Sequence, residues 1–189
     1  MSVFIKIILS AAFCCAPLGA AALEREPVYT YLGPVVGIGM NRLVYTDWQH
    51  LYRENVLSGY YVNSGLSIWV ISKWLLGDVT LQYRFNSYKD EGELHHLYCT
   101  ISGRIGIPLG SVAILAPGVG IYIESPPANR KFNGGAGIRA PLAILFNTTF
   151  DTKLFIEGSF MYGWYGWGDE GEKMSYGADL GFIFKVGRI

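Results

Sequence analysis

Charged side chains recur at every second position of several otherwise apolar segments, and these are the residues most able to do chemistry. The main set is Arg84, Arg104, Glu124, Arg139, Glu157 and Asp179, accompanied by Asp78, Lys153 and Lys185. An isolated ion in a low-dielectric interior is very costly, so such groups must be paired with each other or hydrated. We expect Arg104, Arg139 and Glu157 to form a central cluster, with Arg84 and Glu124 nearer one rim.

Two adjacent histidines offer a second kind of chemistry. His95 and His96, with Ser87 and Asp90 or Glu91 close in sequence, could supply a base and a nucleophile. Neighbours in an extended strand point to opposite faces, which argues against a shared metal site. We interpret the histidines as ordinary strand-end residues and predict no catalytic residue, no metal and no cofactor.

β-strands must position these groups, as the segment 175–186 shows most clearly. One parity is apolar: Tyr176, Ala178, Leu180, Phe182, Phe184 and Val186. The other parity is polar or small, with Ile183 as the only break: Ser175, Gly177, Asp179, Gly181 and Lys185. Successive side chains of a strand point to opposite faces, so this strand has one apolar and one polar wall. We predict eight such segments: 28–45, 56–72, 78–88, 94–107, 111–124, 133–146, 152–165 and 175–186.

The composition indicates that the apolar faces of these strands contact lipid. Hydrophobic residues make up 51% of the chain, charged residues only 16%, and the formal net charge is zero, which argues against a nucleic-acid partner. Alternating strands can face lipid on one side if the sheet closes on itself. A soluble lipocalin-like barrel is the rival, but its outer wall needs Lys and Glu, whereas the polar parity here is mostly Gly, Ser, Thr and Asn. The predicted fold is therefore all-β: an eight-stranded antiparallel up-and-down transmembrane β-barrel.

The first 22 residues indicate an export signal. Lys6 precedes the short apolar stretch 7–16, and Ala20, Ala21 and Ala22 resemble a cleavage site. We predict a cleaved signal peptide over 1–22 and a barrel over 23–189. An uncleaved anchor and lipidation at Cys14 or Cys15 are weaker alternatives.

The predicted connections alternate between short and long. Tight turns are expected at 73–77, 108–110 and 147–151, and longer loops at 46–55, 87–93, 125–132 and 166–173, with the short turns at the periplasmic rim. Pro117 lacks a ladder donor and is expected to mark a bulge. Aromatic girdles are expected where the strands end. Their members would be Tyr45, Trp48, Tyr52, Tyr60, Tyr61, Tyr88, Trp164, Tyr165 and Trp167 at the outer rim, and Trp69, Trp74, Phe146 and Phe150 at the inner rim.

These features resemble the small eight-stranded outer-membrane barrels of the OmpA, OmpX and OmpW types, with the OmpW type slightly preferred on length and signal peptide. Asp179, Gly181, Phe184 and Val186 match the C-terminal pattern that the barrel-assembly machinery reads in such proteins, although three further residues follow here. The resemblance implies a location in the bacterial outer membrane. It also implies lipid and the assembly machinery as partners, and we expect a monomer.

An eight-stranded barrel is only wide enough for its side chains to fill it, or to admit one small ligand. The interior charges therefore predict either a salt-bridged plug or a narrow solute path. The function we predict is a small passive channel or uptake protein for small solutes, hydrophobic ones included. A structural or adhesive barrel with a plugged lumen is the runner-up. A lipid A-modifying enzyme is less favoured, because the His-x-Ser pattern of the deacylases is absent: His96 is followed by Leu97 and Tyr98.

Overall fold

The computed structural model describes residues 27–47, 53–88, 92–126, 134–149, 151–165 and 171–188. The predicted signal peptide and its alternatives lie outside these residues. No helix in the described residues is long and apolar enough to cross a membrane. The strands are β1 (Tyr29–Asp47), β2 (Arg53–Ile71), β3 (Leu75–Tyr88), β4 (Gly92–Ile105), β5 (Ile107–Leu109), β6 (Ala113–Glu124), β7 (Gly135–Asn147), β8 (Thr152–Tyr165) and β9 (Gly171–Arg188).

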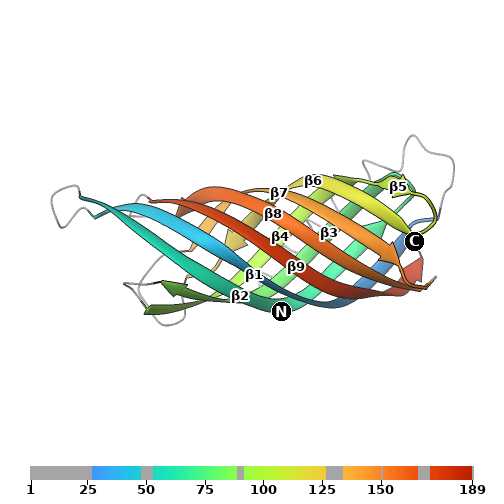
Figure 1. The fold of residues 1–189 in the computed structure, drawn as a ribbon, viewed down its shortest axis with the longest axis horizontal. Coiled ribbons are helices and arrows are strands. Elements are labelled where there is room, and N and C mark those ends of the chain that lie inside the picture. The colour runs from blue at the N-terminus through green and yellow to red at the C-terminus, as the bar shows by residue number, and fades with distance from the viewer. Residues whose placement is uncertain are drawn as a thin grey trace, which may run out of the picture.

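The strands form one closed antiparallel ring. Consecutive strands pair with each other except β4 and β5, which both pair with β6, and β1 pairs with β9. β4 and β5 share one register against β6, so they are two parts of a single strand and the ring has eight strands. The predicted all-β, eight-stranded antiparallel up-and-down barrel is therefore confirmed. Figure 1 shows the elongated, tilted strands of this barrel.

Pro117 explains why the fourth strand is divided. The shared register places Pro117 opposite Ile105, the last residue of β4. Proline has no N–H to donate, so the ladder is interrupted there. The expected bulge at Pro117 was wrong, because the register of β6 is unchanged on either side of it. Among the described pairings, a register shift occurs instead at Thr30/Tyr31 in β1–β9.

The two ends of the barrel differ. The short turns at 72–74 and 110–112 and the connection from β7 to β8 lie at the end we call the turn end, and the opposite end is the loop end. The predicted turn at 108–110 was misplaced, because Pro108 belongs to β5 and the turn begins at Gly110, whose φ of 66° suits glycine. At the loop end, the β1–β2 hairpin reaches beyond the other strands (Figure 1).

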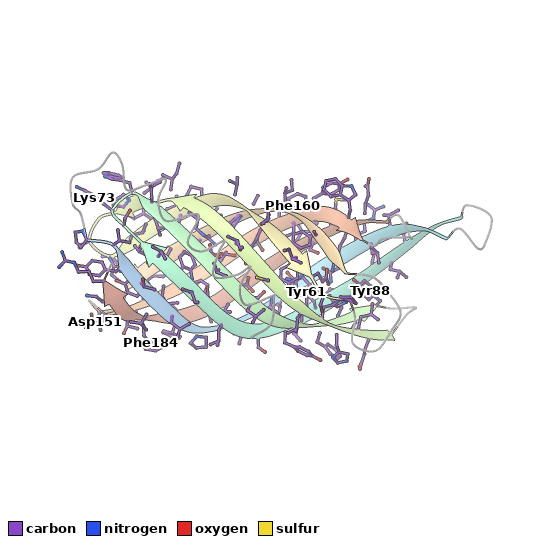
Figure 2. All side chains as sticks on the ribbon, turned by 180° about the vertical axis from the view of Figure 1, so that it is seen from behind. Tyr61, Lys73, Tyr88, Asp151, Phe160 and Phe184 are labelled. Atoms are coloured by element: carbon purple, nitrogen blue, oxygen red, sulfur yellow. The ribbon has the colours of Figure 1, made fainter. Side chains whose placement is uncertain are left out.

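The outer wall is apolar along its length. Large exposed side chains come from all around the ring, for example Ile38, Val62, Leu97, Val119, Ile138 and Leu180, and Figure 2 shows side chains standing off the whole exterior. Tyr60, Trp164 and Trp74 lie on this wall, 68%, 60% and 47% exposed, as predicted for girdle residues.

Three predicted girdle aromatics instead point inward. Tyr61, Tyr88 and Trp69 are at most 3% exposed, and each belongs to the parity that faces the lumen. The predicted girdle positions Trp48, Tyr52, Phe150 and Trp167 lie outside the described residues. Position near a strand end therefore did not predict a girdle residue where the alternation of the strand placed the side chain in the lumen.

Candidate functional site: the barrel lumen

The centre of the lumen holds ion pairs that join opposite walls. On β4, Arg104 lies 2.7 Å (Nε) from Asp78 Oδ1 and 2.5 Å (Nη2) from Glu157 Oε2. On β7, Arg139 also donates to Glu157, and its terminal nitrogens lie 3.5 Å from Asp78 and 3.9 Å from Asp179. These contacts connect β3 and β4 to β7, β8 and β9 across the lumen, so the barrel is cross-braced by charge.

Neutral polar groups complete this central layer. Asp179 accepts hydrogen bonds from Asn63 (3.1 Å) and Gln82 (3.3 Å). Arg139 donates to the hydroxyls of Thr100 (3.2 Å) and Ser102 (3.0 Å). Hydrogen bonds of this kind offset the desolvation of buried charge, so the layer is held by uncharged donors and acceptors as well as by ion pairs.

Arg84 forms a second layer toward the loop end. Its guanidinium carbon lies 3.9 Å from the ring centroid of Tyr61 and 3.8 Å from that of Tyr98, a double cation–π contact. Tyr98 in turn stacks on Tyr122 at 5.2 Å. Arg84 is 1% exposed. The two tyrosine rings therefore stabilise its buried charge through cation–π contacts in place of an ion pair with a carboxylate.

Glu124 forms a separate polar cluster near the same level. Lys173 Nζ donates to both of its oxygens, at 2.8 and 2.7 Å. His96 Nδ1 lies 3.3 Å from Glu124 and 3.0 Å from the carbonyl oxygen of Ser125. Both neighbours of Glu124 are buried, so its charge is compensated inside the barrel.

The lumen near the turn end is filled by apolar side chains, which we call the turn-end plug. Its members are Tyr31, Val35, Trp69, Ile71, Leu76, Ala116, Ala143, Leu145, Phe155 and Ile183. The rings of Trp69 and Phe155 lie 5.2 Å apart, and the Arg104 guanidinium lies 4.5 Å from the Trp69 ring. The sequence-based expectation of a polar interior was therefore wrong for this part of the lumen.

At three glycines that face the lumen, aromatic side chains occupy the space that a Cβ atom would take. A Cβ added at Gly177 would lie 1.9 Å from the Tyr61 hydroxyl, and one at Gly163 would lie 2.4 Å from the Tyr122 hydroxyl. At Gly181, a Cβ would lie 2.4 Å from the Phe155 ring. These glycines leave room for protein side chains rather than for an open path.

The structure places the predicted charged residues as follows. Arg104, Arg139, Glu157 and Asp179 meet in the central layer, whereas Arg84 and Glu124 lie toward the loop end in separate clusters. Lys173 was missed because it was assigned to a loop, although it shares the parity of Ser175 and Asp179. His96 was assigned no role, yet it is 1% exposed beside Glu124.

The histidine pair is split by the wall, as strand geometry requires. His95 is on the exterior, where its Nδ1 lies 2.7 Å from the Tyr83 hydroxyl, and His96 is in the lumen. Among the described residues no group of three His, Cys, Asp or Glu is placed to hold a metal ion. Asp90 and Glu91 lie outside the described residues. That the chain is not an enzyme stays a prediction.

The predicted assembly-signal residues are divided between the two faces of β9. Phe184 and Val186 are 50% and 61% exposed on the outer wall, whereas Asp179 and Gly181 face the lumen. Their recognition by the assembly machinery stays a prediction.

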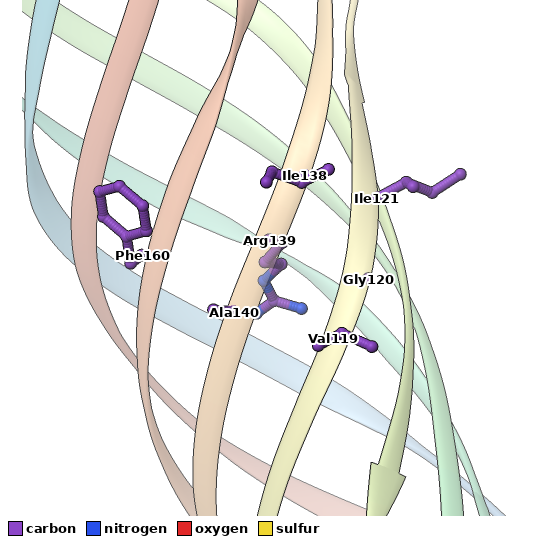
Figure 3. A pocket seen from close by; sticks show the side chains of 7 residues that line it. All are labelled: Val119, Gly120, Ile121, Ile138, Arg139, Ala140 and Phe160. Atoms are coloured by element: carbon purple, nitrogen blue, oxygen red, sulfur yellow. The ribbon is translucent and has the colours of Figure 1, made fainter.

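A hollow of about 430 Å³ lies in the apolar wall of β6, β7 and β8. The small residues Gly120 and Ala140 lie among Val119, Ile121, Ile138 and Phe160 (Figure 3). Its lining is apolar apart from Arg139, which bonds to partners in the lumen. The hollow is thus a depression in the outer wall and no part of a passage along the barrel axis.

Comparison with known proteins extends this description. No family model and no curated protein matches the chain. Among solved structures, the outer membrane protein OprG from Pseudomonas aeruginosa superimposes with a TM-score of 0.58 at 10% identity, over 85% of this chain and 96% of that one. Neisserial surface protein A matches with a TM-score of 0.47 at 10% identity, over 81% and 97% of the two chains. The closed eight-stranded ring, the apolar outer wall and the match to OprG show that the chain has the fold of the small outer-membrane β-barrels.

Proposed function

We propose that this protein is a non-conducting outer-membrane barrel that holds a rigid platform at the cell surface. The observation that carries the proposal is the turn-end plug, in which ten buried apolar residues fill the lumen from several walls. Trp69 and Phe155 come from β2 and β8, on opposite sides of β1 and β9, and their rings meet. A solute moving along the axis would have to displace this packed core.

The platform consists of the loop-end extensions of β1 to β4. The β4–β6 pairing ends at Tyr98–Glu124, whereas β3 and β4 remain paired to Tyr88–Gly92 and β1 and β2 to Asp47–Arg53. Each of these four strands contributes one buried apolar residue to a small core: Leu43, Leu57, Tyr88 and Leu94. This core supports an extended sheet, which fixes where the connections 48–52 and 89–91 begin. Such a platform suits a structural or adhesive role.

A narrow path for small solutes is the second candidate. Several buried nitrogens of the described residues have no hydrogen-bond partner within the protein: Trp69 Nε1, Arg84 Nε and Nη1, Asn86 Nδ2, Arg104 Nη1 and Arg139 Nε. Buried donors of this kind are usually satisfied by water. A hydrated file through the upper and central layers supports a channel, but this path would still have to cross the turn-end plug.

Conductance in planar bilayers separates the two candidates. We expect wild-type protein to show no channel events, because the plug blocks the axis. The double variant Trp69→Ala with Phe155→Ala should open discrete conductance, since it removes the two aromatic rings that meet in the plug.

The matched control removes two aromatic rings from the outer wall, through Phe160→Ala with Trp164→Ala. This variant should stay silent, and the mobility difference between unheated and boiled samples on gels should show that all three proteins are folded. Channel events in the wild-type protein would reject the plugged barrel and support the solute path.

A further inference from the structure

The turn end of the lumen opens into a cavity of about 440 Å³. The described residues that line it are Pro27, Tyr29, Tyr31, Ile71, Ser72, Lys73, Asn147, Thr149 and Lys153. Pro27, Ile71 and the tyrosine rings make much of this lining apolar. The two lysines are the only charged residues among them, so the charge of the described lining favours an anion.

Lys153 is the strongest evidence for a ligand. It is 8% exposed, and its Nζ donates to Asn147 Oδ1 at 2.5 Å and lies 5.5 Å from the Tyr31 ring centroid. Within the part of the chain that the structure describes, no carboxylate lies within ion-pair distance of this ammonium. A largely buried ammonium with only neutral neighbours is costly, and a bound anion would offset that cost.

Asp151, a described acid at this end of the barrel, pairs with a lysine outside the cavity. Asp151 Oδ1 lies 3.6 Å from Lys185 Nζ, and the side chain of Asp151 is 70% exposed. Neither residue lines the cavity. Figure 2 shows Asp151 at the same end of the barrel as Lys73.

The floor of the cavity is closed. Tyr31 and Ile71 line the cavity and also belong to the turn-end plug, where they pack with Trp69. A ligand can therefore enter from the turn end, which is periplasmic in barrels of this type, and it stops at the plug. The cavity therefore ends at the plug and is not the mouth of a path.

We propose that this cavity binds a phosphate group presented on the periplasmic side. Lysine binds phosphate as a point charge, and the Tyr31 and Thr149 hydroxyls can donate to the remaining oxygens. A volume of about 440 Å³ holds more than a bare ion, so the ligand is a small organic phosphate or the phosphate headgroup of an inner-leaflet lipid.

Backbone amide NMR of the ¹⁵N-labelled protein in uncharged detergent micelles tests the site with pyrophosphate as the probe. Added at constant ionic strength, pyrophosphate should shift the amide signals of Ser72 and Thr149 in a saturable manner. Lys153→Met and Lys73→Gln should each weaken binding at least about tenfold, as expected for losing a charge-assisted hydrogen bond. Lys73 is exposed, so its variant remains informative if Lys153→Met fails to fold.

Arg42→Gln is the matched control, because it removes one exposed positive charge from the part of β1 near the loop end, far from the cavity. It should leave pyrophosphate affinity within about twofold of wild type, since an exposed charge at the opposite end of the barrel is screened. Equal weakening by all three variants would mean general electrostatic attraction to the protein and would overturn the proposal.

Nanodiscs distinguish the two sources of phosphate. If the ligand is a lipid headgroup, phosphatidylglycerol nanodiscs should shift the same amides relative to phosphatidylcholine nanodiscs, and Lys153→Met should abolish the difference. If the ligand is soluble, pyrophosphate alone should produce the shifts. The absence of a lysine-dependent shift under both conditions would reject the site.

Discussion

Glu157 is the residue on which the central layer depends most. Both Arg104 and Arg139 pair with it, and all three side chains are buried. Removing a shared acid leaves two guanidinium groups competing for Asp78 and Asp179. Both guanidinium groups would then lose the carboxylate that they share inside this buried layer.

We expect Glu157→Ala to lower the free energy of unfolding by about 3–5 kcal/mol, the cost of breaking a buried pair on one side. Urea unfolding in detergent micelles, followed by tryptophan fluorescence, measures the change. Glu172→Ala is the matched control, because Glu172 is an exposed acid on the outer face of β9. An equal loss in the two variants would contradict a structural role for the network.

The sequence indicates which side chains face inward but not which of them meet. Alternation placed Arg104, Arg139 and Glu157 on the polar wall, and their pairing requires β4 to lie across the lumen from β8. That relation depends on strand tilt and closure, which no local pattern records. Lys173 was missed for a simpler reason: the alternation of β9 was stopped at Ser175, although it continues with the same parity to Gly171.

At the level of the strands, β9 carries the clearest division into two faces. Leu180 is 43% exposed at the middle of the strand, paired with Val36 and Ile156, and Val186 is 61% exposed near the turn end. Both side chains belong to the apolar wall, but they differ in depth. The free-energy cost of the same substitution at the two positions therefore reports the depth of each position in the bilayer.

We expect Leu180→Arg to destabilise the barrel in lipid vesicles by about 2–4 kcal/mol, because it places a charge near the bilayer midplane. Val186→Arg should cost no more than about 1 kcal/mol, since an interfacial charge remains solvated. Equilibrium unfolding in guanidinium from vesicles gives both values. Similar costs at the two positions would show that β9 does not cross the bilayer as we describe.

The strands were the most predictable elements, and their ends the least. All eight strands were predicted because their alternation is long and regular. The bounds of β9 moved most, from the predicted 175–186 to Gly171–Arg188. Trp69 and Ile71 break the alternation of β2 without moving its end, because their apolar inward side chains build the plug. The division at Gly106 depends on Pro117 in the next strand, and thus on a pairing that the segment itself does not reveal.

The whole molecule is asymmetric along its axis. β1 and β2 have 19 residues each, whereas β6 has 12 and β7 has 13. The extra length lies at the loop end (Figure 1), so the β1–β4 platform stands above one side of the ring. A surface role requires this end to face the outside of the cell.

Protease cleavage sites inserted into the protein, with protease then added to intact cells that carry it, test that orientation. A site placed between residues 48 and 52 should be cleaved by added protease in whole cells. The same site in the 110–112 turn should be cleaved only after the outer membrane is permeabilised. The reverse pattern would place the platform in the periplasm and reject its proposed role.

The pairing of β1 with β9 also sets the order of events in biogenesis. Tyr29 lies opposite Arg188, so the first strand to be synthesised waits for the last before either gains its second neighbour. Until then both strands carry an unpaired edge, and an unclosed sheet with such edges is prone to aggregate. We therefore expect truncation of even the final strand to leave an open sheet that is degraded rather than a smaller closed barrel.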